Sequence, residues 1–151
     1  MSPDLEFKID KTTKEDLHEY FKIIDNTFNP PISSRIALDV YAERLANLSR
    51  RVELWEDDRL VGILAVYINA DDKRSAFAAM YSILPEFRGD DDIQVGFRFW
   101  MEKLARQADF DQILCEVYKE NIGLINYYES GGFKKIKDKD ENFIYMALSL
   151  R

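Results

Sequence analysis

The sequence of 151 residues lacks several features that mark whole classes of protein. It has a single cysteine, Cys115, so an internal disulfide is excluded and a reducing compartment is expected. It has only six glycines and four prolines, which excludes collagen-like and low-complexity chains. The longest nearly continuous apolar run, residues 60–68, is far shorter than the ~20 residues that a membrane-spanning helix needs.

Positive charge is also scarce, with 21 Lys and Arg against 28 Asp and Glu, and a formal net charge of −7. General nucleic-acid binding needs a basic surface, so it is not expected. Residues 1–6 have neither a basic flank nor an apolar stretch, so no targeting signal is predicted. We therefore expect a cytoplasmic protein that binds neither membrane nor nucleic acid, and leave a homodimer open. One local site for a small anion is still compatible with this composition.

Apolar residues make up 46% of the sequence and aromatic residues 13%, which is enough for the core of one domain spanning residues 1–151. Strand-like alternation and helix-like spacing follow one another in the order β-α-α-β-β-β-α-β-α-β-β. This order predicts an α/β (α+β) fold, with a central mixed, twisted sheet of about six to seven strands flanked by about four helices.

The element boundaries follow from turn and capping residues. Strands are expected at residues 6–10, 51–56, 60–68, 75–84, 113–118, 133–136 and 143–150. The first helix is expected to begin at Thr13, with Asp16 completing its cap. The second is expected to begin near Ser33 or Ser34 and to carry Ile36, Val40, Leu45 and Leu48, or close neighbours of these residues. A long helix around residues 93–108 and a short one over residues 122–130 complete the set.

Two segments of the chain resemble the GNAT N-acetyltransferase superfamily. The first reads Ile83-Leu84-Pro85-Glu86-Phe87-Arg88-Gly89 and runs into the long helix, like the strand-loop-helix that holds the acyl-CoA diphosphate in that family. The second has Asn121, then Tyr128 seven residues later, then Gly132-Phe133, which matches the family's spacing. The resemblance covers nearly the whole chain. It implies a GNAT-like fold and an enzyme that transfers an acetyl group from acetyl-CoA to a primary amine of a small molecule or peptide.

The resemblance also assigns the residues that bind acetyl-CoA. A helix N-terminus offers unpaired amides and a positive dipole end to a diphosphate. The diphosphate positions are Arg88, Gly89, Asp90, Asp91, Asp92 and Ile93. The family's later glycines are replaced here, and Gln94 takes the last position if the loop is one residue longer. The backbone of Ser82, Ile83 and Leu84 would contact pantetheine and the thioester oxygen, an oxyanion-type contribution.

The three aspartates leave two readings open. Two unit charges ~5 Å apart, at an effective dielectric constant of ~20, interact by about 3 kcal/mol, so a carboxylate in the anion site would repel a diphosphate. Alternatively, Asp90 caps the helix while the other two point to solvent. The first reading leaves a catalytically inactive binding module of the same fold, with weakened or lost CoA binding. Arg88 either faces the ligand or forms a salt bridge with Glu86 or Asp91.

The resemblance also gives Tyr128 and Asn121 their roles, but it leaves the base open, because residues 75–82 lack the carboxylate that many family members carry on this strand. Tyr128 would protonate the departing CoA thiolate, although an ordinary helix aromatic is the alternative. Asn121 would contact the pantetheine arm, cap the short helix, or do both. Glu116 and Tyr81 are candidates for the base that deprotonates the amine.

Other reactive residue types receive structural interpretations. His18, the only histidine, is expected on the surface, and Cys115 in an inert part of the core. No spacing of Cys, His or carboxylate residues predicts a metal site. The acceptor pocket is expected from residues 25–48 and 69–74, where Phe28 and Tyr41 either line the pocket or pack in the core.

Overall fold

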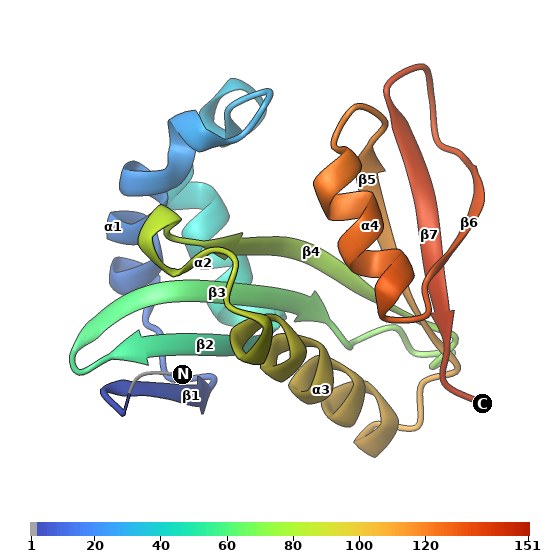
Figure 1. Ribbon diagram of the computed structural model, residues 1–151, viewed down its shortest axis with the longest axis horizontal. Coiled ribbons are helices and arrows are strands. Elements are labelled where there is room, and N and C mark those ends of the chain that lie inside the picture. Colours follow the sequence, from blue (N-terminus) through green and yellow to red (C-terminus); the bar gives the residue numbers. More distant parts are fainter. Residues whose placement is uncertain (1–2) are drawn as a thin grey trace. The chain divides into compact units, whose positions relative to one another are not determined.

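The computed structural model describes residues 3–151 and contains a seven-stranded mixed sheet with the strand order β1-β2-β3-β4-β5-β7-β6 (Figure 1). The strands are β1 (Leu5–Ile9), β2 (Arg50–Glu56), β3 (Arg59–Tyr67), β4 (Ser75–Ile83), β5 (Gln112–Tyr118), β6 (Lys134–Asp138) and β7 (Phe143–Ser149). The α-helices are α1 (Lys14–Ile24), α2 (Leu38–Leu48), α3 (Asp91–Gln107) and α4 (Ile122–Ser130). Short 3-10 turns are η1 (Asp25–Thr27), η2 (Ile32–Ser34) and η3 (Pro85–Phe87). The expected fold class and element order are confirmed.

The chain divides into two compact units. The first contains Met1–Ala65 and Met80–Phe97, and the second contains Val66–Ala79 and Arg98–Arg151. Met1 and Ser2, which belong to the segment where no targeting signal is expected, lie outside the described residues. Among the described helices, none has the length and apolar character needed to cross a bilayer.

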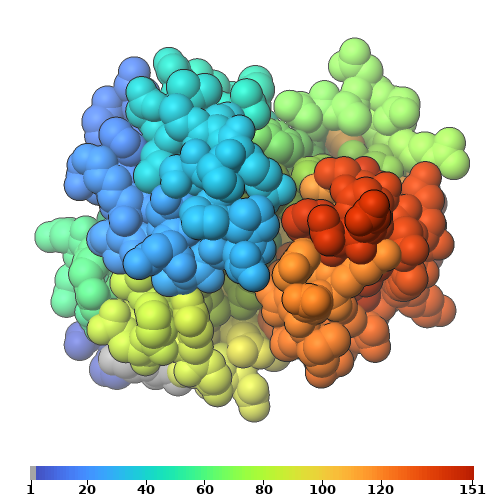
Figure 2. Space-filling model, turned by 90° about the horizontal axis from the view of Figure 1, so that it is seen from above, coloured from blue at the N-terminus to red at the C-terminus, as the bar shows by residue number. Residues whose placement is uncertain are grey.

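The first unit begins with an antiparallel pair of strands and a capped helix. β1 pairs with β2 from Leu5 opposite Glu56 to Ile9 opposite Val52. The side chain of Thr13 accepts from the Asp16 amide, and the Asp16 carboxylate accepts from the Thr13 amide, which is the capping box that the sequence predicts. α1 and α2 pack side by side at the surface (blue to teal in Figure 2), and Phe21 stacks on Tyr41 with ring centroids 5.3 Å apart. Tyr41 thus makes a packing contact with the buried Phe21.

The second helix differs from its prediction. α2 begins at Leu38, because Ser33 is used earlier, where its amide and hydroxyl both donate to the Asp25 carboxylate at 2.8 and 2.5 Å. Its buried residues are Ala42 and Leu45, whereas Val40 is 48% exposed. Leu45 lies five positions after Val40, so at ~3.6 residues per turn the two side chains point about 140° apart around the helix axis. The predicted core face was wrong at Val40, and also at Leu48, which is 54% exposed at the end of the helix.

A buried charged pair ties α2 to the strands of the first unit. Arg51 is 5% exposed and Glu53 is fully buried. The Arg51 guanidinium donates to the Leu45 and Ser49 carbonyl oxygens at 3.0 and 2.8 Å and to Thr12 Oγ1 at 2.7 Å. Glu53 accepts from the amide and hydroxyl of Thr12 at 2.8 and 2.6 Å. These bonds satisfy both charges and join the end of α2, the start of β2 and the segment before α1.

The second unit holds the parallel part of the sheet. Residues Ser75 to Ala78 of β4 run parallel to Gln112 to Cys115 of β5. β7 is antiparallel to both β5 and β6, so the two strands that the sequence predicts at residues 133–136 and 143–150 pair as a C-terminal hairpin. Burial raises the pKa of the Cys115 thiol to about 12, so this residue is an inert part of the core, as the sequence predicts.

Candidate functional site

The end of β4 is held in place by protein contacts. Ser82, Ile83 and Leu84 are all buried. The Leu84 amide donates to the Val61 carbonyl oxygen at 2.9 Å, and the Tyr20 hydroxyl lies 3.1 Å from Ser82 Oγ. Burial raises the pKa of Tyr20 to about 12, so it stays a neutral phenol near neutral pH. The Leu84 amide is thus already bonded, and side chains hold the preceding backbone.

Arg88 forms neither of the salt bridges considered for it within the described part of the chain. Its Nε donates to the Ile83 carbonyl oxygen at 2.9 Å, while Glu86 contacts Arg59 at 3.5 Å. The Arg88 guanidinium therefore bonds back to the end of β4, across the loop between β4 and α3. An arginine fork has five donor hydrogens, so one bond from Nε leaves donors on the terminal nitrogens for an anionic ligand.

A carboxylate caps the start of α3. Asp90 Oδ1 accepts from the Asp92 amide at 2.9 Å and from the Ile93 amide at 3.3 Å. This geometry is that of an N-cap, and it uses two of the amides that a helix start otherwise offers to an anion. Asp90 thus supplies a negative charge at the position where the resemblance places a diphosphate.

The loop just before α3 remains open. Gly89 has a φ of +86°, which only glycine adopts readily, and a Cβ placed there would meet nothing within 4 Å. In the described part of the chain, the amides of Gly89, Asp90 and Asp91 make no hydrogen bond. The residues present therefore fit a phosphate group at these three amides, while the next two amides are taken by the Asp90 carboxylate.

The second segment that resembles the family, Asn121 to Phe133, contains α4 and the residues at its two ends. Asn121 caps the helix through its Oδ1, which accepts from the Leu124 amide at 3.1 Å. Tyr128 lies in the last turn and is 3% exposed, with its ring 4.9 Å from that of Phe133 and 5.4 Å from that of Tyr127. The Tyr128 carbonyl oxygen accepts from the Gly131 and Phe133 amides, both at 3.0 Å. Tyr128 and Phe133 are therefore in contact at the end of this helix, whereas Asn121 lies at its start.

Glu116 has a partner that the sequence gave no reason to expect. Lys139 donates to its carboxylate, and this hydrogen bond raises the pKa of the lysine above its usual value. The Glu116 side chain is 23% exposed. A base must be able to accept a proton from an amine, so Glu116 in that role would first have to exchange its contact with Lys139. The other candidate, Tyr81, packs edge-on against Phe97 in the first unit at 5.4 Å.

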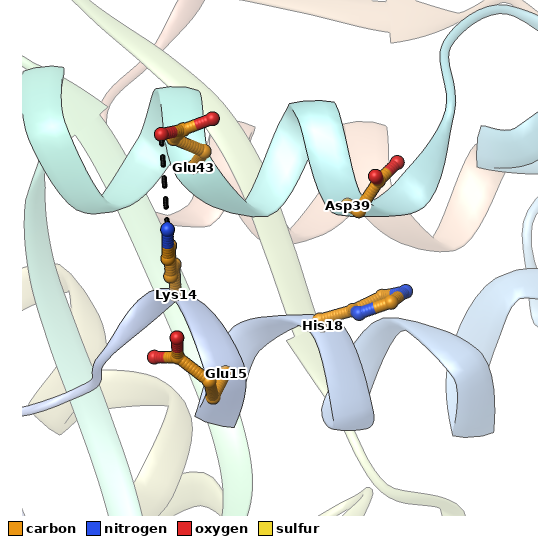
Figure 3. Close-up of a pocket in the computed structure, with 5 residues that line it drawn as sticks. All are labelled: Lys14, Glu15, His18, Asp39 and Glu43. Atoms are coloured by element: carbon orange, nitrogen blue, oxygen red, sulfur yellow. Dashed lines mark ion pairs between the residues drawn. The ribbon is translucent and has the colours of Figure 1, made fainter.

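His18 lines a shallow groove between α1 and α2. The groove has a volume of about 170 Å³ and is lined by Lys14, Glu15, His18, Asp39 and Glu43 (Figure 3). Lys14 and Glu43 approach to 3.9 Å across it, with both side chains more than half exposed. His18 itself is half-buried, which fits its expected place at the surface. Within residues 3–151, no group of three His, Cys, Asp or Glu side chains is arranged to hold a metal ion.

Sequence reasoning missed three side chains around the candidate residues: Tyr20, Lys139 and Arg98. Tyr20 reaches Ser82 across 62 residues, and Arg98 reaches Ser130 across 32. No local pattern links residues at such separations. The one available signal was the Gly131-Gly132 pair, which marks a place where another group approaches the backbone or where φ is positive.

Comparison with known proteins gives matches at the level of structure alone. No family model matches the chain, and no curated protein matches its sequence. A GNAT-family protein from Desulfovibrio desulfuricans superposes with a TM-score of 0.77 at 12% identity, covering 97% of this chain and 99% of the other. The PaiA N-acetyltransferase from Thermoplasma acidophilum, solved with coenzyme A, gives a TM-score of 0.73 at 17% identity, covering 95% and 99%.

A third structure is the spermidine N-acetyltransferase from Vibrio cholerae, solved with CoA and spermine. It superposes with a TM-score of 0.72 at 18% identity, covering 99% of this chain and 97% of the other. Likeness over nearly the full length of each chain shows that this protein has the fold of the GNAT acetyltransferases. At these identities, the likeness concerns the fold, whereas function depends on the residues of the site.

Proposed function

We propose that this chain, with its GNAT fold, is an N-acyltransferase that moves an acetyl group from acetyl-CoA to a primary amine. The observation that carries the proposal is the segment from Asn121 to Phe133. Of the residues that carry its resemblance to the family, Asn121 caps the start of α4, and Tyr128 and Phe133 are in contact at its end. By this resemblance, Tyr128 would serve as the general acid of the reaction.

The first unit would hold the phosphate end of acetyl-CoA. The amides of Gly89, Asp90 and Asp91 supply hydrogen-bond donors, and Arg88 supplies a positive charge beside them. Asp92 and Ile93 continue this helix start, with their amides bonded to Asp90. The backbone of Ser82 and Ile83 at the end of β4 would contact the pantetheine arm. Leu84 would contribute through its position alone, because its amide is bonded to Val61.

In the second unit, Tyr128 would act as the general acid. Acetyl-CoA supplies an activated acyl group as a thioester. The amine nitrogen forms a bond to the acyl carbon, the carbon–sulfur bond breaks, and the electron pair leaves on sulfur. The phenol of Tyr128 gives its proton to that sulfur and later regains one from water, while the amine loses a proton to a base. A thiol with a pKa of ~8.5 leaves more readily when a neighbouring phenol with a pKa of ~10 supplies the proton in the same step.

For the base, we propose Glu116, acting after Lys139 has moved away or through an intervening water. Tyr81 stays a second candidate on the first unit. Asn121 would serve the pantetheine arm through its amide nitrogen, since its Oδ1 is used by the Leu124 amide. A carboxamide has separate donor and acceptor ends, so the capping and binding roles are compatible.

We expect the acceptor to be a small cationic amine. A net charge of −7 favours the encounter with cations over anions. The Vibrio cholerae protein of the same fold is named for such an amine, spermidine. A peptide amine is the other acceptor class that the resemblance allows.

The cap on α3 favours one alternative, a binding module of this fold without catalytic activity. The Asp90 carboxylate occupies two amides at the helix start and carries a charge that opposes a diphosphate. If this repulsion prevails, CoA binding is weak or lost and the fold serves another role.

Thermal unfolding with and without acetyl-CoA distinguishes the N-acyltransferase from the binding module. A ligand present at 100 times its Kd adds about 2.7 kcal/mol to the free energy of unfolding, which raises the Tm of a domain of this size by ~5–10 °C. We expect such a rise, followed by release of CoA thiol when spermidine, an aminohexose or a lysine peptide is added. An unchanged Tm at millimolar acetyl-CoA would favour the binding module.

A further inference from the structure

Arg98, near the middle of α3, makes a set of contacts with the end of α4. Its Nη1 donates to the Tyr127 carbonyl oxygen at 3.1 Å and to Ser130 Oγ at 2.7 Å. Ser130 Oγ in turn donates to the same Tyr127 carbonyl oxygen at 2.7 Å. The guanidinium carbon also lies 5.0 Å from the centre of the Tyr127 ring, over its face. One side chain therefore fixes a carbonyl, a hydroxyl and a ring in the last turn of α4.

These contacts suit the chemistry of a helix end. The last carbonyl groups of a helix lack partners within the helix, and this end of the dipole is negative. A planar guanidinium satisfies both needs, because it carries a positive charge and directs several donors from one fork. A lysine at the same place would keep the charge but would lose the flat face that rests on Tyr127.

Gly131 provides the space that Arg98 occupies. A Cβ at this position would lie 2.7 Å from Arg98 Cδ and 3.1 Å from its Nη1. The φ of Gly131 is −89°, which any residue adopts, so glycine is needed here for room. The next residue differs, since Gly132 has a φ of +96° and needs glycine for its backbone conformation. Of the two glycines, Gly131 is thus matched to Arg98.

Tyr128 lies between the two points that Arg98 holds. It follows Tyr127 directly, and Ser130 is two residues further on. Its own carbonyl oxygen is bonded to the Gly131 and Phe133 amides, and its ring rests on Phe133. A movement of the Tyr127 carbonyl or of Ser130 would therefore turn the backbone that aims the Tyr128 phenol.

We propose that Arg98 is a positioning residue for Tyr128, and that Gly131 is the glycine that admits it. This assignment rests on the proposed function for the catalytic part, whereas the contact itself stands on the geometry above. Proton transfer depends on the distance and direction of the donor, and a displacement of about 1 Å can cost on the order of 100-fold in rate.

The test compares Arg98→Ala, Arg98→Lys and Gly131→Ala with Lys103→Ala, a control on the same helix. In the described structure, Lys103 lies over the Phe99 and Trp100 rings of its own helix. Transfer from acetyl-CoA to spermidine, or to the panel amine that the wild type acetylates, gives kcat. We expect Arg98→Ala and Gly131→Ala to lower kcat by roughly 10- to 100-fold, with the Kd for acetyl-CoA unchanged. Arg98→Lys should fall in between, and Lys103→Ala should match the wild type.

A second background separates positioning from general stability. When Tyr128 is already Phe, Arg98→Ala should lower kcat no further, because there is no phenol left to aim. Likewise, Gly131→Ala should add nothing to Arg98→Ala. An equal loss in both Tyr128 backgrounds, or a loss of the same size from Lys103→Ala, would overturn the proposal.

A measurement without turnover covers the case in which the wild type transfers no acetyl group. Amide hydrogen exchange over residues 124–133 should be faster in Arg98→Lys and Gly131→Ala than in the wild type, and unchanged in Lys103→Ala. An inactive wild type with this pattern would remove the proposed function and leave the Arg98 anchor in place. Unchanged exchange in both variants would remove the anchor, whatever the activity.

Discussion

The starts of α3 and α4 satisfy the same structural need with different charges. At α3, Asp90 Oδ1 accepts from the Asp92 and Ile93 amides. At α4, Asn121 Oδ1 accepts from the Leu124 amide. Both residues are good N-caps, and as caps they are nearly equivalent. Asp90 caps with a carboxylate, however, whereas Asn121 caps with an uncharged carboxamide.

This difference separates folding from binding at the two positions. A helix start attracts anions through its free amides and its dipole, so a charged cap stabilises the helix while it competes with any anionic ligand. A neutral cap stabilises the helix without that competition. The segment that keeps the family pattern has the neutral cap, and the segment that departs from it has the charged one. We therefore expect substitutions near α3 to alter binding and substitutions in α4 to alter catalysis.

The largest expected effect is at α4. Tyr128→Phe removes the proposed acid and should lower kcat by ~100-fold or more, with little change in the Kd for acetyl-CoA, because general acid catalysis contributes about that much. Steady-state kinetics and calorimetry measure the two quantities. The matched control is Tyr127→Phe, which keeps a ring under Arg98 and should retain full activity. Equal activity of both variants would contradict the acid role of Tyr128.

The next effect is at α3. Asp90→Asn keeps an oxygen to cap the helix but removes the charge, so acetyl-CoA should bind about tenfold more tightly, which corresponds to ~1.4 kcal/mol. Titration calorimetry at constant ionic strength measures the change. Asp58→Asn, in the exposed turn between β2 and β3, changes the net charge by the same amount and should have no effect. If the two variants bind acetyl-CoA equally, Asp90 does not face the ligand.

The caps themselves predict a smaller, shared effect on stability. Asp90→Ala and Asn121→Ala should each lower the free energy of unfolding by ~1 kcal/mol, since each removes a side-chain acceptor from a helix start. Urea unfolding followed by circular dichroism gives these values. If one variant lost several times more free energy of unfolding than the other, Asp90 and Asn121 would not be equivalent caps.

The smallest effect is expected from a substitution that gives the start of α4 a charged cap in place of its neutral one. Asn121→Asp keeps the cap but replaces the amide donor proposed for the pantetheine arm with a carboxylate, so it should leave stability nearly unchanged and weaken acetyl-CoA binding. The loss should be only about threefold, because an exposed charge is screened by salt. Raising the salt concentration should reduce this difference. Unchanged or stronger binding in the variant would contradict the proposed contact of Asn121 with the pantetheine arm.

The fold was largely readable from the sequence because its signals are local. The capping box of Thr13 and Asp16 joins residues only three positions apart, and α4 spans residues 122–130, as the sequence predicts. α2 was misplaced because Ser33, a good cap by type, is bonded to Asp25 instead. Tertiary contacts of this kind override local preference.

The candidate site was readable only in part. The Asn121 cap follows from a local pattern, and its bond is confirmed. The contacts of Glu116 with Lys139 and of Arg98 with Ser130 connect residues 23 and 32 positions apart, respectively. Such pairs are decided by how strands and helices are brought together, and a single sequence carries no periodic trace of them.

The buried pair of Arg51 and Glu53 has a consequence for how this chain diverges. Loss of either side chain alone would leave the other charge buried without its partner, which would lower the free energy of unfolding by ~3–5 kcal/mol. Replacing both with well-packed apolar residues can leave stability unchanged. A single substitution at either position is therefore strongly destabilising, and both residues must change together. Descendants of this sequence should retain both charges or lack both, even where the loop before α3 has changed beyond recognition.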